Sequence, residues 1–298
     1  MTNIMENTKG VLTSVPKTKK HKAKPIELFF FVDPINPECW SLAPTMKKLE
    51  LEYGEYFSTK YILWGNLKSF NILPKHHDEL AKNWRLVSNR SGMSCDDSLW
   101  IENPLTSSFN ASIGIKAAEM QGKKVGEMFL RKVQEAVFIY KMDVTKPENL
   151  IKIARELNID LEEFISDLNL EGATIALQND VRLSNEMTVD DTPTIIFYGD
   201  KFDDEGLRIF GAFSFEVYEQ ILIEKLGFQP KKAELPSIEE FLEKYGVVAS
   251  QEIATVYKKS LDEVNKKMTE FLFDKKVERI SAKYGDFWRL NNSISLGA

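Results

Sequence analysis

Two short segments, far apart along the chain, place the strongest constraint on its fold. The first, Phe29 to Trp40, is an apolar run that passes through Asp33-Pro34 and reaches Cys39 at the start of a helical pattern. The second, Asp191 to Phe197, has Thr192-Pro193 directly before another apolar run. Continuous apolar runs of this length indicate strands buried on both faces. The two segments therefore predict a sheet whose central strands border a cysteine-bearing loop.

This order of elements is typical of a thioredoxin-type thiol site from which one part is missing. Such a site carries Cys-x-x-Cys, in which the helix N-terminus activates the first thiol and the second thiol resolves the mixed disulfide. This chain has Asn36-Pro37-Glu38-Cys39 instead, so the exposed nucleophile is absent. We interpret Asn36 and Cys39 as a vestigial redox site and predict no catalytic residue. We expect Cys39 to be a buried small hydrophobe, with a reactive or redox-sensing thiol as the alternative.

Thr192-Pro193 stands where a thioredoxin-type site has its cis-proline. We expect this peptide bond to be cis, which would expose the backbone of Thr192 beside the cysteine loop. An extended peptide can pair with such an exposed edge. We therefore predict a partner-binding groove formed by Asn36, Trp40, Thr192 and Pro193. An ordinary proline between a loop and a strand is the alternative.

Length and composition narrow the class of protein. A chain of 298 residues favours two unequal domains. Its two cysteines, Cys39 and Cys95, are too few for a disulfide framework, so we expect a cytoplasmic protein. A single disulfide bond between them is the alternative. No segment approaches the roughly 20 apolar residues of a membrane-spanning helix. A net charge of -6 gives no electrostatic reason to expect nucleic-acid binding.

The sequence predicts neither a metal site nor a bound cofactor. Its histidines are His21, His76 and His77, and none of them stands at a ligand spacing with another histidine or a cysteine. The sequence also contains no glycine-rich phosphate loop and no paired-carboxylate motif of recognisable spacing.

Periodicity divides the chain into four parts. Residues 1–25 are polar and rich in lysine, and we expect a disordered basic arm. Residues 26–229 predict a thioredoxin-like α/β domain of the DsbA type, interrupted at about 78–186 by a large helical insertion. Residues 230–236, bracketed by two prolines, are predicted to be a linker.

The fourth part, residues 237–290, is predicted to be a small α+β module that resembles a winged helix. Its pattern is three short helices followed by two strands that form a wing. A winged helix suggests DNA binding, but residues 235–298 carry ten basic and ten acidic side chains. Because phosphate neutralisation supplies most non-specific DNA affinity, this balance disfavours nucleic-acid binding and favours a protein-contact role.

Several motifs together resemble the YjbH (SpxH) adaptors of Firmicutes, over residues 26–290. The matching residues are Phe31-Val32-Asp33-Pro34, Pro37-Glu38-Cys39-Trp40, Ser91-Gly92-Met93-Ser94-Cys95-Asp96, Ser98-Leu99-Trp100, Glu102-Asn103-Pro104, Val277-Glu278-Arg279, Lys283-Tyr284-Gly285 and Phe287-Trp288-Arg289. The resemblance implies a DsbA-like protein that binds the transcription factor Spx and promotes its degradation by the ClpXP protease. Two features depart from the family: Asn36 replaces the first cysteine, and the lysine-rich arm replaces a zinc-binding N-terminal segment.

The sequence therefore predicts an adaptor that acts as a non-catalytic scaffold in stress-response regulation. Its expected partner is Spx, with ClpX as a second candidate contact. A thiol-disulfide oxidoreductase or isomerase of the DsbA type is the enzymatic alternative, and a DNA-binding regulator is the third hypothesis. The sequence leaves open which surface binds the client, what the oligomeric state is and what triggers regulation.

Overall fold

The computed structural model describes residues 24–65, 70–199 and 205–291. The predicted disordered arm, residues 1–25, lies outside this part of the chain except for its last two residues. Within the described ranges, no helix is long and apolar enough to cross a membrane.

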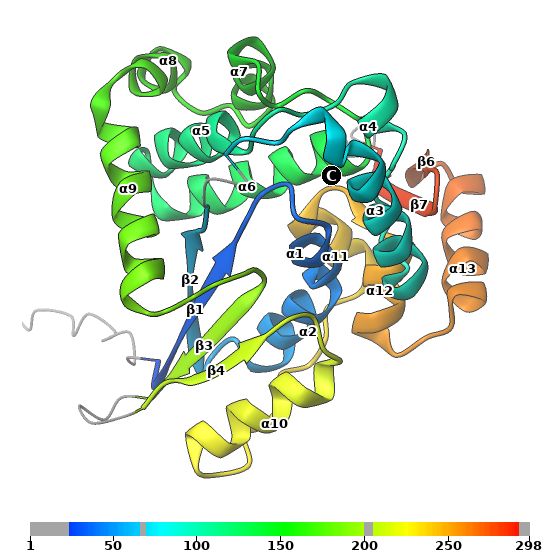
Figure 1. The fold of residues 1–298 in the computed structure, drawn as a ribbon. Helices are drawn as coiled ribbons and strands as arrows, with labels where there is room; N and C mark the ends of the chain where they lie inside the picture. Colours follow the sequence, from blue (N-terminus) through cyan, green and yellow to red (C-terminus); the bar gives the residue numbers. More distant parts are fainter. Residues whose placement is uncertain (1–23, 66–69, 200–204, 292–298) are drawn as a thin grey trace, which may run out of the picture.

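A four-stranded mixed sheet forms the centre of the molecule (Figure 1). Its strand order is β2-β1-β3-β4, with β2 parallel to β1 and the other neighbours antiparallel. The strands are β1 (Ile26–Val32), β2 (Phe57–Leu63), β3 (Thr194–Tyr198) and β4 (Leu207–Phe210). Parallel neighbours need a crossover connection, which α1 (Pro37–Ser41) and α2 (Ala43–Tyr53) provide here.

Both faces of the sheet are covered, as the continuous apolar runs predict. Leu28 and Phe30 belong to the main core cluster, which they share with α2 and α10 (Phe215–Leu226). Phe31, which follows Phe30, points into a second cluster, which it shares with residues that end and follow α9 (Glu171–Glu186). Successive side chains of a strand point to opposite faces, so this division of one run between two clusters follows from its extended backbone.

A large helical insertion separates β2 from β3, as predicted. Figure 1 shows these helices gathered at one end of the sheet, with α9 returning along its side. The helices before α9 are α3 (His77–Ser91), α4 (Leu99–Glu102), α5 (Phe109–Met120), α6 (Lys123–Phe138), α7 (Pro147–Glu156) and α8 (Leu161–Asn169). The thioredoxin-like, DsbA-type fold class is therefore confirmed.

The C-terminal module has the element order of a winged helix. It comprises α11 (Ile238–Tyr245), β5 (Val248–Ala249), α12 (Ser250–Tyr257), α13 (Leu261–Phe273), β6 (Val277–Ala282) and β7 (Gly285–Leu290). The three strands pair antiparallel in the order β5-β7-β6. Capping boxes at Ser237 and Ser260 fix the starts of α11 and α13 by satisfying backbone donors in both directions. The short β5 is an addition to the predicted elements.

This module has a core cluster of its own, but one side of it packs into the core of the thioredoxin part. Val247, Ala249 and Phe287 belong to the main core cluster, and the Phe287 ring stacks on Trp40 with 6.1 Å between ring centroids. The predicted linker is also anchored. The Ala233 N–H donates to the Glu52 carbonyl (2.9 Å), and Lys232 forms an ion pair with the Glu52 carboxylate (2.7 Å).

A buried ionic cluster joins three helices across this boundary. The Glu252 carboxylate of α12 forms ion pairs with Lys47 of α2 (2.8 Å) and Arg131 of α6 (3.0 Å). It also accepts a hydrogen bond from the Ala249 N–H (2.8 Å). Burial alone would raise the pKa of Glu252, but the Arg131 and Lys47 charges outweigh burial and hold that pKa below its ordinary value.

Replacing this carboxylate should cost much of the fold's stability. Glu252→Gln removes the ion-pair partner of buried Lys47 and leaves Arg131 with Glu135 alone (3.0 Å), so we expect the free energy of unfolding to fall by about 3–5 kcal/mol. Glu278→Gln is the matched control, because it removes the exposed ion pair with Arg289 and should cost about 1 kcal/mol or less. Denaturant unfolding of both variants measures the difference. Equal losses would show that the buried cluster is not a major source of stability.

Candidate functional site

Asn36 occupies the position at which a thioredoxin-type site carries its first cysteine, and it starts the following helix. Its side-chain Oδ1 accepts a hydrogen bond from the Glu38 N–H (2.9 Å), as an N-cap residue does. Pro37 follows at the first helical position, where its fixed φ suits a helix start. The local sequence therefore forms the helix start of a thioredoxin-type site without a thiol at its tip.

The same side chain reaches across to the cis-proline loop. The Thr192-Pro193 bond is cis, as predicted. Asn36 Nδ2 donates to the Thr192 carbonyl (2.9 Å) and to Thr192 Oγ1 (3.0 Å), while the Thr192 N–H donates to Asp191 Oδ1 (2.7 Å). Both backbone polar groups of Thr192 are thus paired within the chain. The expectation that this backbone lies open to a peptide is wrong, because Asn36 and Asp191 occupy its hydrogen-bonding positions.

Trp40 lies in the core, which contradicts its predicted place in a partner-binding groove. Its side chain is 0% exposed and stacks against Phe138, with 5.4 Å between ring centroids. The indole Nε1 donates to the Ser94 carbonyl (3.0 Å), and the Arg131 guanidinium lies over the ring. Pro193 is buried as well. Of the four residues predicted to form the groove, only Asn36 is partly exposed.

Both cysteines are free and buried, which agrees with the interpretation of Cys39 as a small packed hydrophobe. The bridge between Cys39 and Cys95 that the sequence left open does not form. Burial raises the pKa of both thiols, because a thiolate loses its hydration there. Burial also raises the pKa of the neighbouring Asp33 carboxyl, to about 7.

Thiol labelling tests this closed arrangement. In the folded wild type, we expect neither cysteine to react with iodoacetamide at neutral pH, and we expect both to react after unfolding. Asn36→Cys should gain one thiol that labels rapidly in the folded state, because the helix N-terminus lowers its pKa. Asn36→Ala is the control and should gain none. Mass spectrometry counts the labels, and fast labelling of folded wild type would contradict the burial of its thiols.

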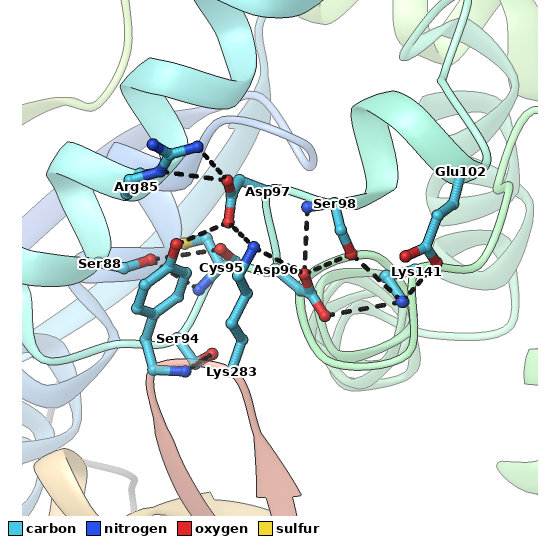
Figure 2. Close-up of polar contacts among 11 residues, drawn as sticks. Arg85, Ser88, Ser94, Cys95, Asp96, Asp97, Ser98, Glu102, Lys141 and Lys283 are labelled. Carbon is cyan, nitrogen blue, oxygen red and sulfur yellow. Dashed lines mark hydrogen bonds and ion pairs between the residues drawn. The ribbon is translucent and has the colours of Figure 1, made fainter.

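A polar network holds the tip of the C-terminal wing (Figure 2). Asp97, only 3% exposed, accepts hydrogen bonds from Lys283 Nζ (2.6 Å), the Tyr284 hydroxyl (2.7 Å) and Arg85 Nη2 (2.9 Å). The Tyr284 N–H also donates to Ser94 Oγ (3.1 Å). Lys283 and Tyr284 form the turn between β6 and β7, so the wing tip is fixed to the loop that follows α3.

The same loop is tied to the helical insertion. Ser98 Oγ donates to Asp96 Oδ1 (2.7 Å), and Lys141, just beyond α6, donates to Ser98 Oγ (3.2 Å) and Glu102 (2.5 Å). Figure 2 shows these side chains converging with the Asp97 group on one short segment. The resemblance had marked Ser91 to Asp96 and Lys283 to Gly285 as motifs. Sequence reasoning missed their contact, because no spacing pattern links residues so far apart.

The Asp97 network makes stability depend on pH. Burial alone would raise the pKa of Asp97, but hydrogen bonds from Lys283, Tyr284 and Arg85 lower it from 3.8 to about 2. A carboxyl whose pKa is lower in the folded state stabilises that state above its unfolded pKa. This stabilisation is lost as the pH falls from about 4 through 2.

Removing the Asp97 charge should reproduce that loss at neutral pH. We expect Asp97→Asn to lower the free energy of unfolding by about 2 kcal/mol, the equivalent of the pKa difference. The gap between variant and wild type should narrow as the pH approaches 2. Asp190→Asn, at an exposed position, is the control and should change little. Urea unfolding across this pH range measures the gap, and a gap independent of pH would argue against the assigned pKa.

The fold and this site define a thioredoxin-like protein of the DsbA type in which Asn36, and not a cysteine, begins the helix that carries Cys39. A putative protein disulfide isomerase from Nitrosomonas europaea aligns with a TM-score of 0.60 at 20% identity, covering 68% of this chain and 98% of that one. A probable DsbA oxidoreductase from Streptomyces coelicolor aligns with a TM-score of 0.55 at 15% identity, covering 72% and 94%. The family model described as Thioredoxin matches residues 29–220.

Closer relatives extend over almost the whole chain. The ClpXP adapter protein SpxH of Bacillus subtilis (strain 168) is 45% identical over 277 residues, which cover 92% of each chain. The protein of the same name from Halalkalibacterium halodurans is 41% identical, covering 91% of this chain and 90% of the relative. The chain belongs to this SpxH family of thioredoxin-like proteins.

Proposed function

We propose that this protein is a cytoplasmic adaptor that binds the transcription factor Spx and promotes its degradation by ClpXP. The observation that carries the proposal is the near-complete alignment with relatives named ClpXP adapter protein SpxH. The alignment includes the C-terminal module, which extends beyond the thioredoxin match at residues 29–220. The proposed partners are thus Spx as client and ClpXP as the protease that receives it.

The arrangement of the thiol site supports a non-catalytic mechanism. With Asn36 as the N-cap and both thiols buried, client binding depends on surface complementarity rather than on a mixed disulfide. An adaptor that holds the client near the unfoldase raises its effective concentration there without a covalent step. The chain therefore acts as a scaffold, and Asn36 and Cys39 are a vestigial redox site with a structural role.

Two alternatives lack this support. A DsbA-type oxidoreductase needs an accessible thiolate, and burial raises the pKa of both cysteines instead. A winged helix that contacts DNA through its wing needs a free wing tip, whereas Lys283 and Tyr284 at this wing tip donate to Asp97. The balance of ten basic and ten acidic side chains in residues 235–298 gives DNA no net attraction.

Reconstituted proteolysis tests the proposal. With purified Spx, ClpX, ClpP and ATP, we expect the wild-type protein to accelerate the loss of Spx. Cys39→Ala and Cys95→Ala should retain this effect if they remain folded, because no step uses a thiolate. An unrelated ClpXP substrate is the control and should be degraded at an unchanged rate. Equal Spx loss with and without the protein would refute the adaptor function.

Insulin reduction separates the scaffold from the enzyme. We expect no turnover by the wild type, because a thiol must be accessible as a thiolate to attack a disulfide. Turnover by the wild type that disappears in Cys39→Ala would support the oxidoreductase alternative instead.

A further inference from the structure

A groove of about 710 Å³ lies beside the closed thiol site. One wall begins with Ser41 and Leu42, which directly follow Cys39-Trp40. A second wall is the loop after β4, whose Gly211 N–H donates to the Pro193 carbonyl (2.8 Å). The C-terminal module supplies a third wall from the end of α12 and the start of α13. The groove thus exists only where the thioredoxin part and the C-terminal module meet.

The groove is basic although the chain as a whole is acidic. Its charged lining comprises Lys48, Arg90, Lys258 and Lys259, with Glu216 as the acidic member. Lys48 donates to the Thr255 carbonyl (2.9 Å), and Arg90 forms an ion pair with Glu38. Lys258 and Lys259 are exposed, and neither forms an ion pair of 4.0 Å or less with any residue that the structure describes, although the Glu216 and Glu219 carboxylates interact with the Lys258 charge at longer range. These two lysines are therefore available to a partner.

Large apolar side chains also face this groove from both parts of the molecule. Phe213, from the loop before α10, is 49% exposed, and Leu261, at the start of α13, is 43% exposed. Exposed apolar surface inside a concave site is typical of a protein-binding surface. A small anion would use the lysines and leave Phe213 and Leu261 uncovered.

The combination indicates the chemistry of the occupant. Opposite charges across an interface steer association and select the partner, so a segment with acidic side chains fits the lysines. Apolar side chains of that segment would cover Phe213 and Leu261. The serine and threonine hydroxyls of the lining, such as Ser41 and Thr45, can hydrogen-bond an extended backbone. Duplex DNA has the negative charge that the lysines attract, but it has no apolar side chains to cover Phe213 and Leu261.

We propose that this groove binds an acidic segment of the client protein that also carries apolar side chains. The inference rests on the proposed adaptor function for the client's identity and adds its site and its chemistry. Binding here replaces the Thr192 edge, which Asn36 and Asp191 close. The C-terminal module then has a defined role, because it supplies Lys258, Lys259 and Leu261 to the groove.

A labelled synthetic peptide of alternating glutamate and leucine, read by fluorescence anisotropy, tests the groove directly. We expect the double variant Lys258→Glu/Lys259→Glu to bind it at least about tenfold more weakly than wild type, since attraction becomes repulsion. Lys266→Glu/Lys275→Glu is the matched control. It makes the same change in net charge at exposed sites of the same module, and Lys275, like Lys258, has a positive φ. The control should bind as wild type does.

Three further measurements complete the test. Phe213→Ser should bind the glutamate–leucine peptide more weakly than wild type does. Wild type should bind a glutamate–serine peptide more weakly than the glutamate–leucine peptide. A duplex DNA oligonucleotide should not compete. Competition by DNA, or equal peptide binding by the two double variants, would overturn the proposal. Circular dichroism confirms that each variant is folded.

The same variants, assayed with Spx, separate the two proposals. If Lys258→Glu/Lys259→Glu loses Spx binding and Lys266→Glu/Lys275→Glu keeps it, the result supports both the adaptor function and the groove as the client site. Unchanged Spx binding in that variant overturns the groove as the client site and leaves the adaptor function standing. If wild type binds the peptide but neither binds Spx nor accelerates its loss, the adaptor function fails while the groove's preference for acidic segments stands.

Discussion

The arrangement of the molecule depends on the ion pairs that the buried Glu252 carboxylate of α12 forms with Lys47 of α2 and Arg131 of α6. These helices come from three separate parts of the sequence: the thioredoxin core, its insertion and the C-terminal module. A buried charge is tolerated only when its partners are in place, so Lys47 and Arg131 specify one relative placement of the three. The Arg131 guanidinium also covers Trp40, which extends the same constraint to the helix that carries Cys39.

A second constraint, the Asn36 side chain, determines what the thioredoxin-type site can do. In a redox enzyme, the helix N-terminus and the cis-proline loop leave a thiolate and a backbone edge exposed together. Here the Asn36 amide caps the helix with its oxygen and pairs with Thr192 through its nitrogen. One side chain thus stands where a redox site has its first thiol and also pairs with the backbone of the cis-proline loop. The groove beside Lys258 and Phe213, next to this site, is the surface that we propose for a partner.

Much of the fold could be predicted because its signals are local. The apolar run at Ile26 to Val32, Pro37 at the helix start and the Thr192-Pro193 step each follow from short-range rules of backbone conformation. The wing followed from the two apolar segments around Tyr284-Gly285. The two-residue strand β5 could not be predicted, because Val248-Ala249 is too short to show a period.

The candidate site was predicted less well than the fold. The errors of that prediction concern contacts between side chains rather than the positions of helices and strands. Nothing in the sequence near Trp40 indicates that Phe287 and Phe138 cover it, so a residue beside a thiol site was expected at the surface. Lys283 and Asp97 likewise form a pair that only the folded chain brings together. The resemblance marked Ser91 to Asp96 and Lys283 to Gly285 but not Asp97, and it could not show that these segments lie together.

The stacking of Phe287 on Trp40 has a consequence for how this protein can be dissected and how it can diverge. A chain truncated before α11 would expose the Trp40 indole and the Arg131 side chain, which are otherwise covered. If such a fragment did not bind a partner, the cause could be misfolding rather than the removal of a binding surface. For the same reason, the winged part cannot be exchanged for that of a distant relative unless the ring at position 40 and its cover change together. The two parts are therefore expected to be inherited as one unit.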